Sequence, residues 1–195
     1  MANIFFTADT HFGHALMTAE SRRCPRPWAT AEEMTEALIA NWNATVGEKD
    51  IVYHLGDVSF LKAGQTFDVL RRLNGFKHLV RGNHDNLNQQ NLAEFESVAD
   101  LKEIKVEGQR IVLCHYALMT WNKMHNGSWM LHGHSHGALK VDETKCRMDV
   151  GVDARALPGR PETYRPIPFE HIKLVMDAKQ PFVPVDHHGT DKYEG

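Results

Sequence analysis

Gly82-Asn83-His84-Asp85 is the stretch of sequence on which the prediction of the fold depends. It directly follows residues 76–80, Phe-Lys-His-Leu-Val, an apolar run that reads as a buried strand. Glycine lets the backbone turn sharply, and the next three residues place an amide, an imidazole and a carboxylate within one turn. Such groups can hold a metal ion and transfer a proton. Taken alone, the stretch is equally compatible with an ordinary loop.

Two earlier strands are predicted to end in the same way. Residues 3–8 form an apolar run that ends at Asp9 and His11, and residues 50–55 form a second run that ends at Asp57. Side chains alternate along an extended segment, so Asp9 and His11 point to the same side. In sheets flanked by helices, sites form at the carboxyl ends of the strands. We therefore expect these clusters along one sheet edge.

The second half of the chain has a different hydrophobic pattern, which predicts a hairpin. Apolar and polar residues alternate through residues 98–114, around a tight turn at Glu107-Gly108. The returning strand ends at His115. This hairpin can bring further histidines to the edge that carries the first clusters.

Two more short strands complete the pattern. Residues 128–132 are followed by His134 and His136, which again lie two positions apart. A last strand is predicted over residues 147–152 and ends near Asp153.

Helices are predicted between the strands. Thr30 opens one of them, with Glu33 at capping-box spacing. A second helix is expected over residues 62–73, a weaker one over residues 87–96, and a final one over residues 168–178. Strands separated by helices favour a mostly parallel sheet in the first half and an α/β fold.

The strand ends together offer three carboxylates, one amide and five imidazoles. They are Asp9, Asp57, Asp85, Asn83, His11, His84, His115, His134 and His136. Mixed nitrogen and oxygen ligation without a thiolate suits manganese, iron or zinc rather than calcium or an iron–sulfur cluster. Even without His84 and Asp85, the remaining seven groups are more ligands than one ion takes, and they suit two ions. The alternative is that each residue independently ends a strand or caps a turn. This explanation suits a single cluster, but it does not readily account for five clusters that each follow a predicted strand.

Composition limits the class of protein. The 195 residues suffice for one well-buried domain, predicted over residues 1–180, and residues 181–195, rich in Pro, Asp, His and Gly, are expected to form a mobile tail. A net charge of −3 gives no global sign of nucleic acid or of an acidic membrane, although a local basic patch leaves nucleic acid open. Three distant cysteines, without a signal peptide or an apolar run of membrane-spanning length, predict a cytoplasmic protein.

The order of these motifs resembles the signature of the calcineurin-like metallophosphoesterases. The resemblance rests on Asp9-x-His11, Gly56-Asp57, Gly82-Asn83-His84-Asp85, His115 and Gly133-His134-Ser135-His136. The opening residues 6–14 are most similar to small bacterial and phage members described as predicted phosphoesterases. The resemblance implies a four-layer α/β/β/α sandwich, with two mixed sheets between helices.

The resemblance also implies roles for individual residues. One metal ion would be held by Asp9, His11 and His136, a second by Asn83, His115 and His134, and Asp57 would bridge them. A hydroxide bridging the two ions, of which manganese is favoured over iron, zinc or nickel, would attack phosphorus directly. His84 would stabilise or protonate the leaving oxygen, and Asp85 would orient His84. His14 and Arg26 are the candidate phosphate contacts, with a supporting role as the alternative for His14.

Some positions depart from the family pattern. Val58-Ser59-Phe60 stands where diadenosine tetraphosphatases and Ser/Thr phosphoprotein phosphatases carry Asp-Arg-Gly after their Asp, and Asp85 stands where they carry Glu. These two substrate classes are therefore disfavoured. The loops of residues 22–28 and 117–127 are the predicted walls of a substrate site. The first has a solvated connector as its alternative.

The resemblance implies a phosphoester hydrolase, and we favour a phosphodiester or a small nucleotide as the substrate. Trp28 and Trp121 could stack on a base, although packing is the commoner use of tryptophan. The alternatives are a phosphomonoesterase acting on a small molecule and a binding module that keeps the fold without catalysis. The complete ligand set and His84 argue against the binding module. The sequence predicts no particular oligomeric state.

Overall fold

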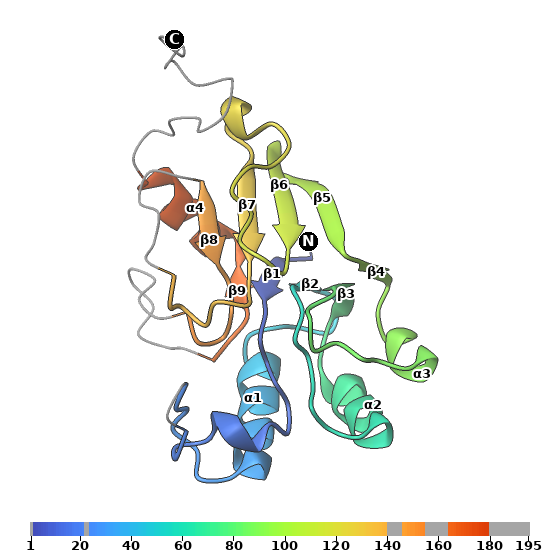
Figure 1. Ribbon diagram of the computed structural model, residues 1–195. Helices are drawn as coiled ribbons and strands as arrows, with labels where there is room; N and C mark the ends of the chain where they lie inside the picture. Colours follow the sequence, from blue (N-terminus) through green and yellow to red (C-terminus); the bar gives the residue numbers. More distant parts are fainter. Residues whose placement is uncertain (1, 22–23, 140–145, 155–163, 180–195) are drawn as a thin grey trace.

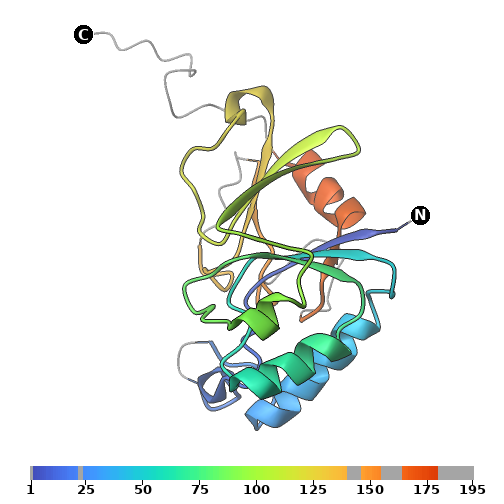
Figure 2. The same cartoon turned by 90° about the vertical axis from the view of Figure 1, so that its right-hand side faces the viewer.

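The protein folds into two sheets that pack against each other, with helices on both sides. The computed structural model describes residues 2–21, 24–139, 146–154 and 164–179. Helices α1 (Ala31–Asn43) and α2 (Ala63–Arg72) cover the outer face of the first sheet, and α4 (Phe169–Asp177) packs beside the core between the sheets (Figures 1 and 2). The predicted fold class, an α/β arrangement of two mixed sheets flanked by helices, is confirmed.

The first sheet carries most of the strand ends predicted to form the site. In the spatial order β4-β3-β2-β1-β9, its strands are β4 (Ser97–Ala99), β3 (Phe76–Val80), β2 (Ile51–His54), β1 (Ile4–Thr7) and β9 (Ile167–Pro168). Strands β1 to β4 run parallel, and β9, which the sequence analysis missed, runs antiparallel to β1. Thr7 pairs with His54, and His54 pairs with Leu79. The three central strands therefore end level with one another.

The second sheet brings the later histidines to the same region. Its strands are β5 (Leu101–Val106), β6 (Gln109–Cys114), β7 (Trp129–His132) and β8 (Arg147–Asp149), in that spatial order. β5 and β6 form the predicted hairpin, whose turn has positive φ at Glu107 and Gly108. β6 and β7 are parallel, so His115 and His134 follow strands that end at one edge.

Two hydrophobic cores hold the layers together. The first lies between the first sheet and helices α1 and α2, and it includes Phe5, Met34, Trp42, Leu70 and Leu79. The second lies between the sheets and includes Phe6, Leu55, Val80, Ile111, Leu131 and Ile172. Because side chains alternate along a strand, Phe5 and Phe6 of β1 face different cores. Strand β1 is thus buried on both faces.

Two stretches differ from the expected secondary structure. The helix predicted over residues 87–96 is reduced to α3 (Gln89–Leu92), which Asn88 caps. The strand predicted from residue 98 is divided at Asp100, because β4 pairs with β3 in the first sheet and β5 pairs with β6 in the second. Hydrophobic alternation shows that a segment is extended, but it does not show which sheet pairs with it.

The segment of residues 117–127 covers the outer face of the second sheet. It contains the short helix η2 (Met124–Asn126), and Trp121 and Met124 pack against Val112 and Met130. The expectation of a loop or broken helix agrees with this arrangement. Another short helix, η1 (Ala15–Met17), follows the first strand-end loop.

Two predictions extend beyond the residues that the structure describes. The predicted tail, residues 181–195, falls outside the described residues, and the single domain over residues 1–180 stays a prediction. Within the described ranges, no helix has the length and apolar character needed to cross a membrane.

His54, the last residue of β2, predicts how the stability of the metal-free protein depends on pH. Its Nδ1 accepts the N–H of Gly56 at 3.2 Å, and Nε2 lies 2.9 Å from the Thr10 hydroxyl oxygen. Burial, reinforced by His115, lowers the pKa of His54 to about 3. Since this lies below the ordinary value of 6.5, the unfolded chain binds the proton more readily. Stability from His54 is present above pH 6.5 and is lost as pH falls towards 3.

We therefore expect the unfolding free energy to fall more steeply for the wild type than for His54→Gln between pH 6 and 4.5. The expected difference in slope is about 1 kcal/mol per pH unit. Urea unfolding with a chelator present measures it, because no bound cation then competes for the imidazoles. Parallel profiles of the two proteins would show that His54 takes up a proton without unfolding.

Candidate metal centre

The predicted ligands occupy strained backbone positions at the strand ends. Among the described residues, eight other than glycine have positive φ, and five of these are predicted ligands. They are Asp9, His11, Asp57, His134 and His136, with φ between 47° and 66°. Such conformations cost about 1–3 kcal/mol each and collect at functional sites. The strain is therefore an observation about this site that is independent of the residue types.

The strand-end loops are joined to each other by backbone hydrogen bonds. The N–H of Asp9 donates to the carbonyl of Gly56 at 2.9 Å, and the N–H of His11 donates to the carbonyl of Asp57 at 3.1 Å. The Asp9 carboxylate in turn accepts the N–H of His134 at 3.0 Å. Loops of the first and second sheets are thereby fixed against each other.

Asp9, His11 and His136 form the first ligand group. One ligand atom from each lies within 4.8 Å of the others. His11 is buried, and neither of its ring nitrogens has a hydrogen-bond partner among the described residues. Burial lowers the pKa of the His11 ring to about 2 and raises that of the Asp9 carboxyl. A neutral imidazole with a free lone pair beside a carboxylate is what a divalent cation binds.

Asp57, His115 and His134 form the second group, which has the same close spacing. Nδ1 of His115 lies 2.7 Å from the carbonyl of Leu55 and donates to it, so Nε2 carries the lone pair. That nitrogen is 3.1 Å from Asn83 Oδ1 and 3.5 Å from Asp57 Oδ2. These three acceptor atoms lie close enough together that they would hold a cation.

Asp57 stands between the two groups. Its Oδ2 lies 3.7 Å from His11 Nε2 and 3.5 Å from His115 Nε2. Its Oδ1 accepts the backbone N–H of His84 at 2.9 Å, which ties the Gly82–Asp85 turn to the centre. The nitrogen and oxygen donors, the buried lone pairs of His11 and the position of Asp57 fit divalent cations. The structure brings all seven predicted ligands into this one region.

His84 and His14 lie at the open side of the centre. His84 is exposed, and its ring centroid is 6.1 Å from that of His11. His14 stacks on Phe60 with centroids 3.8 Å apart, and its Nδ1 is buried without a partner in the described structure. These positions allow both imidazoles to meet a group held at the ligands, as the sequence analysis expects.

Asp85 has a different role from the one expected. Its carboxylate accepts three backbone N–H groups, from Asp57 at 2.9 Å, Val58 at 2.8 Å and Gly82 at 2.8 Å. These bonds join the loop after β2 to the turn after β3. Asp85 therefore fixes the backbone that carries Asp57, instead of orienting the ring of His84.

Arg26 is also placed differently from its expected contact with phosphate. Only 1% of its surface is exposed. The guanidinium donates to both carboxylate oxygens of Asp153, at 2.9 and 2.7 Å, and to the carbonyls of Asp9 and Thr10. A guanidinium that is buried and bonded in this way supports the loop that carries Asp9 and does not face a substrate.

Asp153 is the functional residue that sequence reasoning left out of the site. Nδ1 of His136 lies 2.7 Å from the Asp153 carboxylate and donates to it, so a metal ion would bind Nε2 in place of the proton there. Although burial opposes charge on both groups, their hydrogen bond raises the pKa of His136 to about 10 and helps lower that of Asp153 to about 2. The signal was a carboxylate at a predicted strand end, the same pattern that identified Asp9 and Asp57. The thiol of Cys24 lies close to this pair and was also missed.

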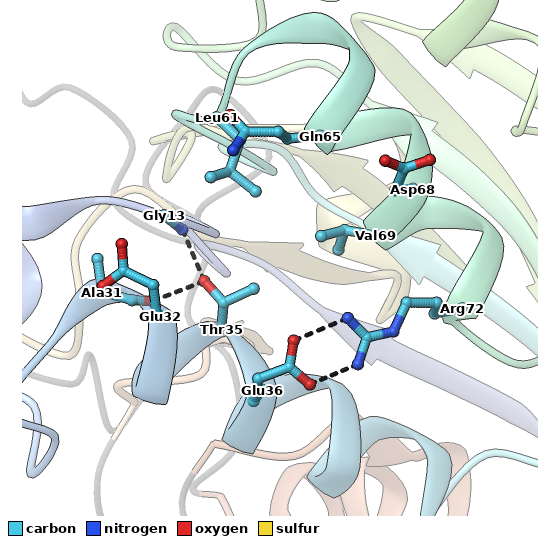
Figure 3. A pocket seen from close by; sticks show the side chains of 10 residues that line it. All are labelled: Gly13, Ala31, Glu32, Thr35, Glu36, Leu61, Gln65, Asp68, Val69 and Arg72. Atoms are coloured by element: carbon cyan, nitrogen blue, oxygen red, sulfur yellow. Dashed lines mark hydrogen bonds and ion pairs between the residues drawn. The ribbon is translucent and has the colours of Figure 1, made fainter.

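A separate cavity of about 280 Å³ lies between α1 and α2 (Figure 3). It is lined by Gly13, Ala31, Glu32, Thr35, Glu36, Leu61, Gln65, Asp68, Val69 and Arg72. Across it, the guanidinium of Arg72 binds the carboxylate of Glu36 through two nitrogens, and the hydroxyl of Thr35 accepts the N–H of Gly13 (Figure 3). None of the lining residues is a predicted ligand, so the cavity is distinct from the metal centre.

Comparison with known proteins establishes the family. Residues 3–166 match the calcineurin-like phosphoesterase superfamily domain, and the chain belongs to this family. Membership supports a metal-dependent phosphoester hydrolase.

Two relatives and one solved structure resemble most of this chain. An uncharacterized protein of Methanocaldococcus jannaschii is 33% identical over 186 residues, covering 92% of this chain and 94% of its own. The gene 66 protein of Mycobacterium phage D29 is 28% identical over 184 residues, covering 79% of this chain and 89% of its own. A protein of unknown function from Aquifex aeolicus shares the fold, with a TM-score of 0.62, 22% identity, and coverage of 90% of this chain and all of the other.

Asp153→Asn tests the support of His136. We expect Mn²⁺ affinity to fall about 10- to 100-fold, the usual cost of losing an outer carboxylate that orients a ligand histidine. Isothermal titration calorimetry measures the affinity, and circular dichroism confirms that the variant is folded. Asp100→Asn, which changes an exposed carboxylate paired with Arg81, is the matched control. Unchanged affinity in Asp153→Asn would remove Asp153 from the metal centre.

Gly82→Ala tests the close approach of the turn to Asp57. A Cβ at residue 82 would lie 2.2 Å from Asp57 Oδ1 and 2.5 Å from Asp57 N, so the backbone must shift. We expect a loss of about 1–3 kcal/mol in unfolding free energy, as in other overpacked sites. We also expect weaker Mn²⁺ binding.

Gly64→Ala in α2 is the control, because a Cβ there meets nothing within 4 Å. This variant should be as stable as the wild type or slightly more so, since alanine favours the helix. Chemical denaturation with and without Mn²⁺ compares the two. Equal stability and equal metal affinity of Gly82→Ala and the wild type would contradict the close packing.

Proposed function

We propose that the protein is a phosphoesterase that works with two divalent metal ions and favours phosphodiesters or small nucleotides. The observation that carries the proposal is the placement of Asp57 Oδ2 between His11 Nε2, at 3.7 Å, and His115 Nε2, at 3.5 Å. A carboxylate oxygen near ligands of two groups is suited to bridge two ions. Family membership supports the same chemistry.

The donor set decides which ions are expected. Imidazoles, carboxylates and one amide favour manganese, with iron, zinc and nickel as alternatives. When bound, a pair of such ions supplies a nucleophile from water and neutralises charge on the phosphoryl group. The chain contributes ligands on strand-end loops that backbone hydrogen bonds join to each other, and these would set the separation of the two sites.

His84 is the proposed proton donor to the leaving oxygen. Its backbone is fixed by Asp57 Oδ1, while its side chain is exposed beside the first ligand group. A positioned imidazole contributes about 10²- to 10⁴-fold to such a reaction. His14, whose ring centroid is 5.4 Å from that of His11, is the proposed contact of the phosphate.

The placement of Arg26 favours a diester over a monoester. A monoester carries up to two negative charges, and its site gains from cationic side chains around the phosphate. Arg26, the guanidinium that the sequence offered for this purpose, is buried against Asp153. A diester carries one charge and two organic groups, so it depends less on such a cation.

The free cysteines Cys24, Cys114 and Cys146 favour the cytoplasm as the compartment.

The test compares bis-p-nitrophenyl phosphate with p-nitrophenyl phosphate as substrates of metal-stripped protein. Mn²⁺, Ni²⁺, Zn²⁺ and Mg²⁺ are added back separately. We expect activity to return with metal, to be highest with Mn²⁺, and to favour the diester. His84→Ala should lower kcat by about 10²- to 10⁴-fold with little change in Mn²⁺ affinity. His125→Ala, an exposed histidine of η2 at the amino end of β7, is the control (Figure 1).

Three results would change the proposal. A preference for the monoester would make the protein a phosphomonoesterase. Full activity in His84→Ala would exclude the proton-donor role. Binding of two ions without hydrolysis of either compound would favour a non-catalytic binding module on this fold.

A further inference from the structure

Two large aromatic side chains are exposed at the metal centre. Phe60 is 40% exposed and Tyr116 is 47% exposed. Each follows a predicted ligand closely in the chain, Phe60 after Asp57 and Tyr116 after His115. Isolated exposed apolar residues are common on protein surfaces, but two rings that both contact metal-ligand side chains need a separate explanation.

Phe60 lies against the first ligand group and the proposed proton donor. Its centroid is 3.8 Å from that of His14, 5.2 Å from that of His11 and 5.0 Å from that of His84. His11 and His14 are themselves only 5.4 Å apart, so they cannot lie on opposite faces of the phenyl ring. With His84 also beside it, the phenyl ring still has 40% of its residue surface exposed, so part of it is available to a ligand.

Tyr116 lies against the second ligand group. Its ring meets that of His115 at 5.2 Å and that of His134 at 4.9 Å, both with steep interplanar angles of 75° and 64°. Edge contacts of this kind fix the orientation of a ring while leaving much of its surface to solvent.

The two rings therefore flank the centre. Phe60 contacts His11, Tyr116 contacts His115, and Asp57 Oδ2 lies within 4 Å of both histidines. A phosphate held at the ligands has one exposed aromatic ring on the side of each ligand group. The two ester groups of a phosphodiester leave phosphorus in different directions, so each can meet a ring.

The tryptophans considered in the sequence analysis do not take this role. Trp121 is buried in the core outside the second sheet, and its indole N–H donates to the carbonyl of Ser128. Trp28 packs edge-on against Tyr164 with centroids 4.8 Å apart. Phe60 and Tyr116 are the aromatic residues whose exposure and contacts place them at the ligands.

We propose that Phe60 and Tyr116 form a subsite for planar rings, and that the substrate is a phosphoester with a nucleobase on an organic group. This rests on the proposed function only in assuming that the phosphate binds at the ligands. Stacking of a base on an aromatic side chain raises affinity about tenfold or more and tolerates any base, because every base presents a π-face.

The experiment compares the binding of AMP and ribose 5-phosphate to Mn²⁺-loaded protein by calorimetry. The two compounds carry the same phosphate and sugar and differ in the base. We expect the wild type to bind AMP about tenfold more tightly. Phe60→Leu and Tyr116→Leu should each reduce this preference, and the double variant should lower it to about twofold or less, with ribose 5-phosphate affinity unchanged.

Phe76→Leu is the matched control. It makes the same substitution at an exposed phenylalanine that begins β3, at the end of the strand opposite the ligands. It should keep the full preference for AMP. Equal binding of the two compounds to the wild type would overturn the proposal. So would a preference that survives in the double variant, or a parallel loss of affinity for both compounds, which would assign the rings to supporting the ligands.

Hydrolysis of bis-p-nitrophenyl phosphate separates this proposal from the proposed function. Hydrolysis by a wild type that binds AMP and ribose 5-phosphate equally would overturn the aromatic subsite and leave the phosphoesterase in place. A ring-dependent preference for AMP in a protein that hydrolyses no phosphoester would support the subsite and overturn the enzymatic function.

Discussion

The Asp57 carboxylate is the contact through which the two sheets share one site. One of its oxygens lies within 4 Å of His11, from the first sheet, and of His115, from the second, and the other holds the backbone of His84. Asp57 reaches this position at a φ of 58°, a conformation that costs an ordinary residue about 1–3 kcal/mol. The two hydrophobic cores, which fix the strands before and after it, must offset that cost.

Two further carboxylates, the partly buried Asp85 and the buried Asp153, keep the loops around Asp57 in place. Asp85 joins two strand-end loops through three backbone N–H groups, and Asp153 links Arg26 to His136. Removing one partner of a buried charge pair commonly costs 3–5 kcal/mol, roughly, because the remaining charge is uncompensated. A loop that moved Arg26 away from Asp153 would incur such a cost. The ligands are therefore held by a polar framework that is itself strongly constrained.

The sequence predicted that the candidate ligands lie close together, because one simple rule applies to their positions. A parallel strand buried in a sheet ends in polar residues only where the chain leaves the core, so Asp9, Asp57 and His134 could be recognised without a structure. The rule does not describe what a side chain meets across the fold. Arg26 and Asp153 are 127 residues apart, and nothing local distinguishes a buried arginine from an exposed one. The exposure of Phe60 and the burial of Trp121 also depend on contacts made across the fold.

The centre also shows how the fold and its cofactor depend on each other. In the part of the chain that the structure describes, the two buried ring nitrogens of His11 have no hydrogen-bond partner, and burial disfavours the charged form of Asp9. These groups lower the stability of the chain by itself, since a buried polar atom without a partner costs about 1–3 kcal/mol. A cation that binds only the folded state raises the free energy of unfolding by mass action and so offsets that loss. The strain at five ligand positions, joined by backbone hydrogen bonds between loops, means that the chain sets the ligand geometry before a cation binds.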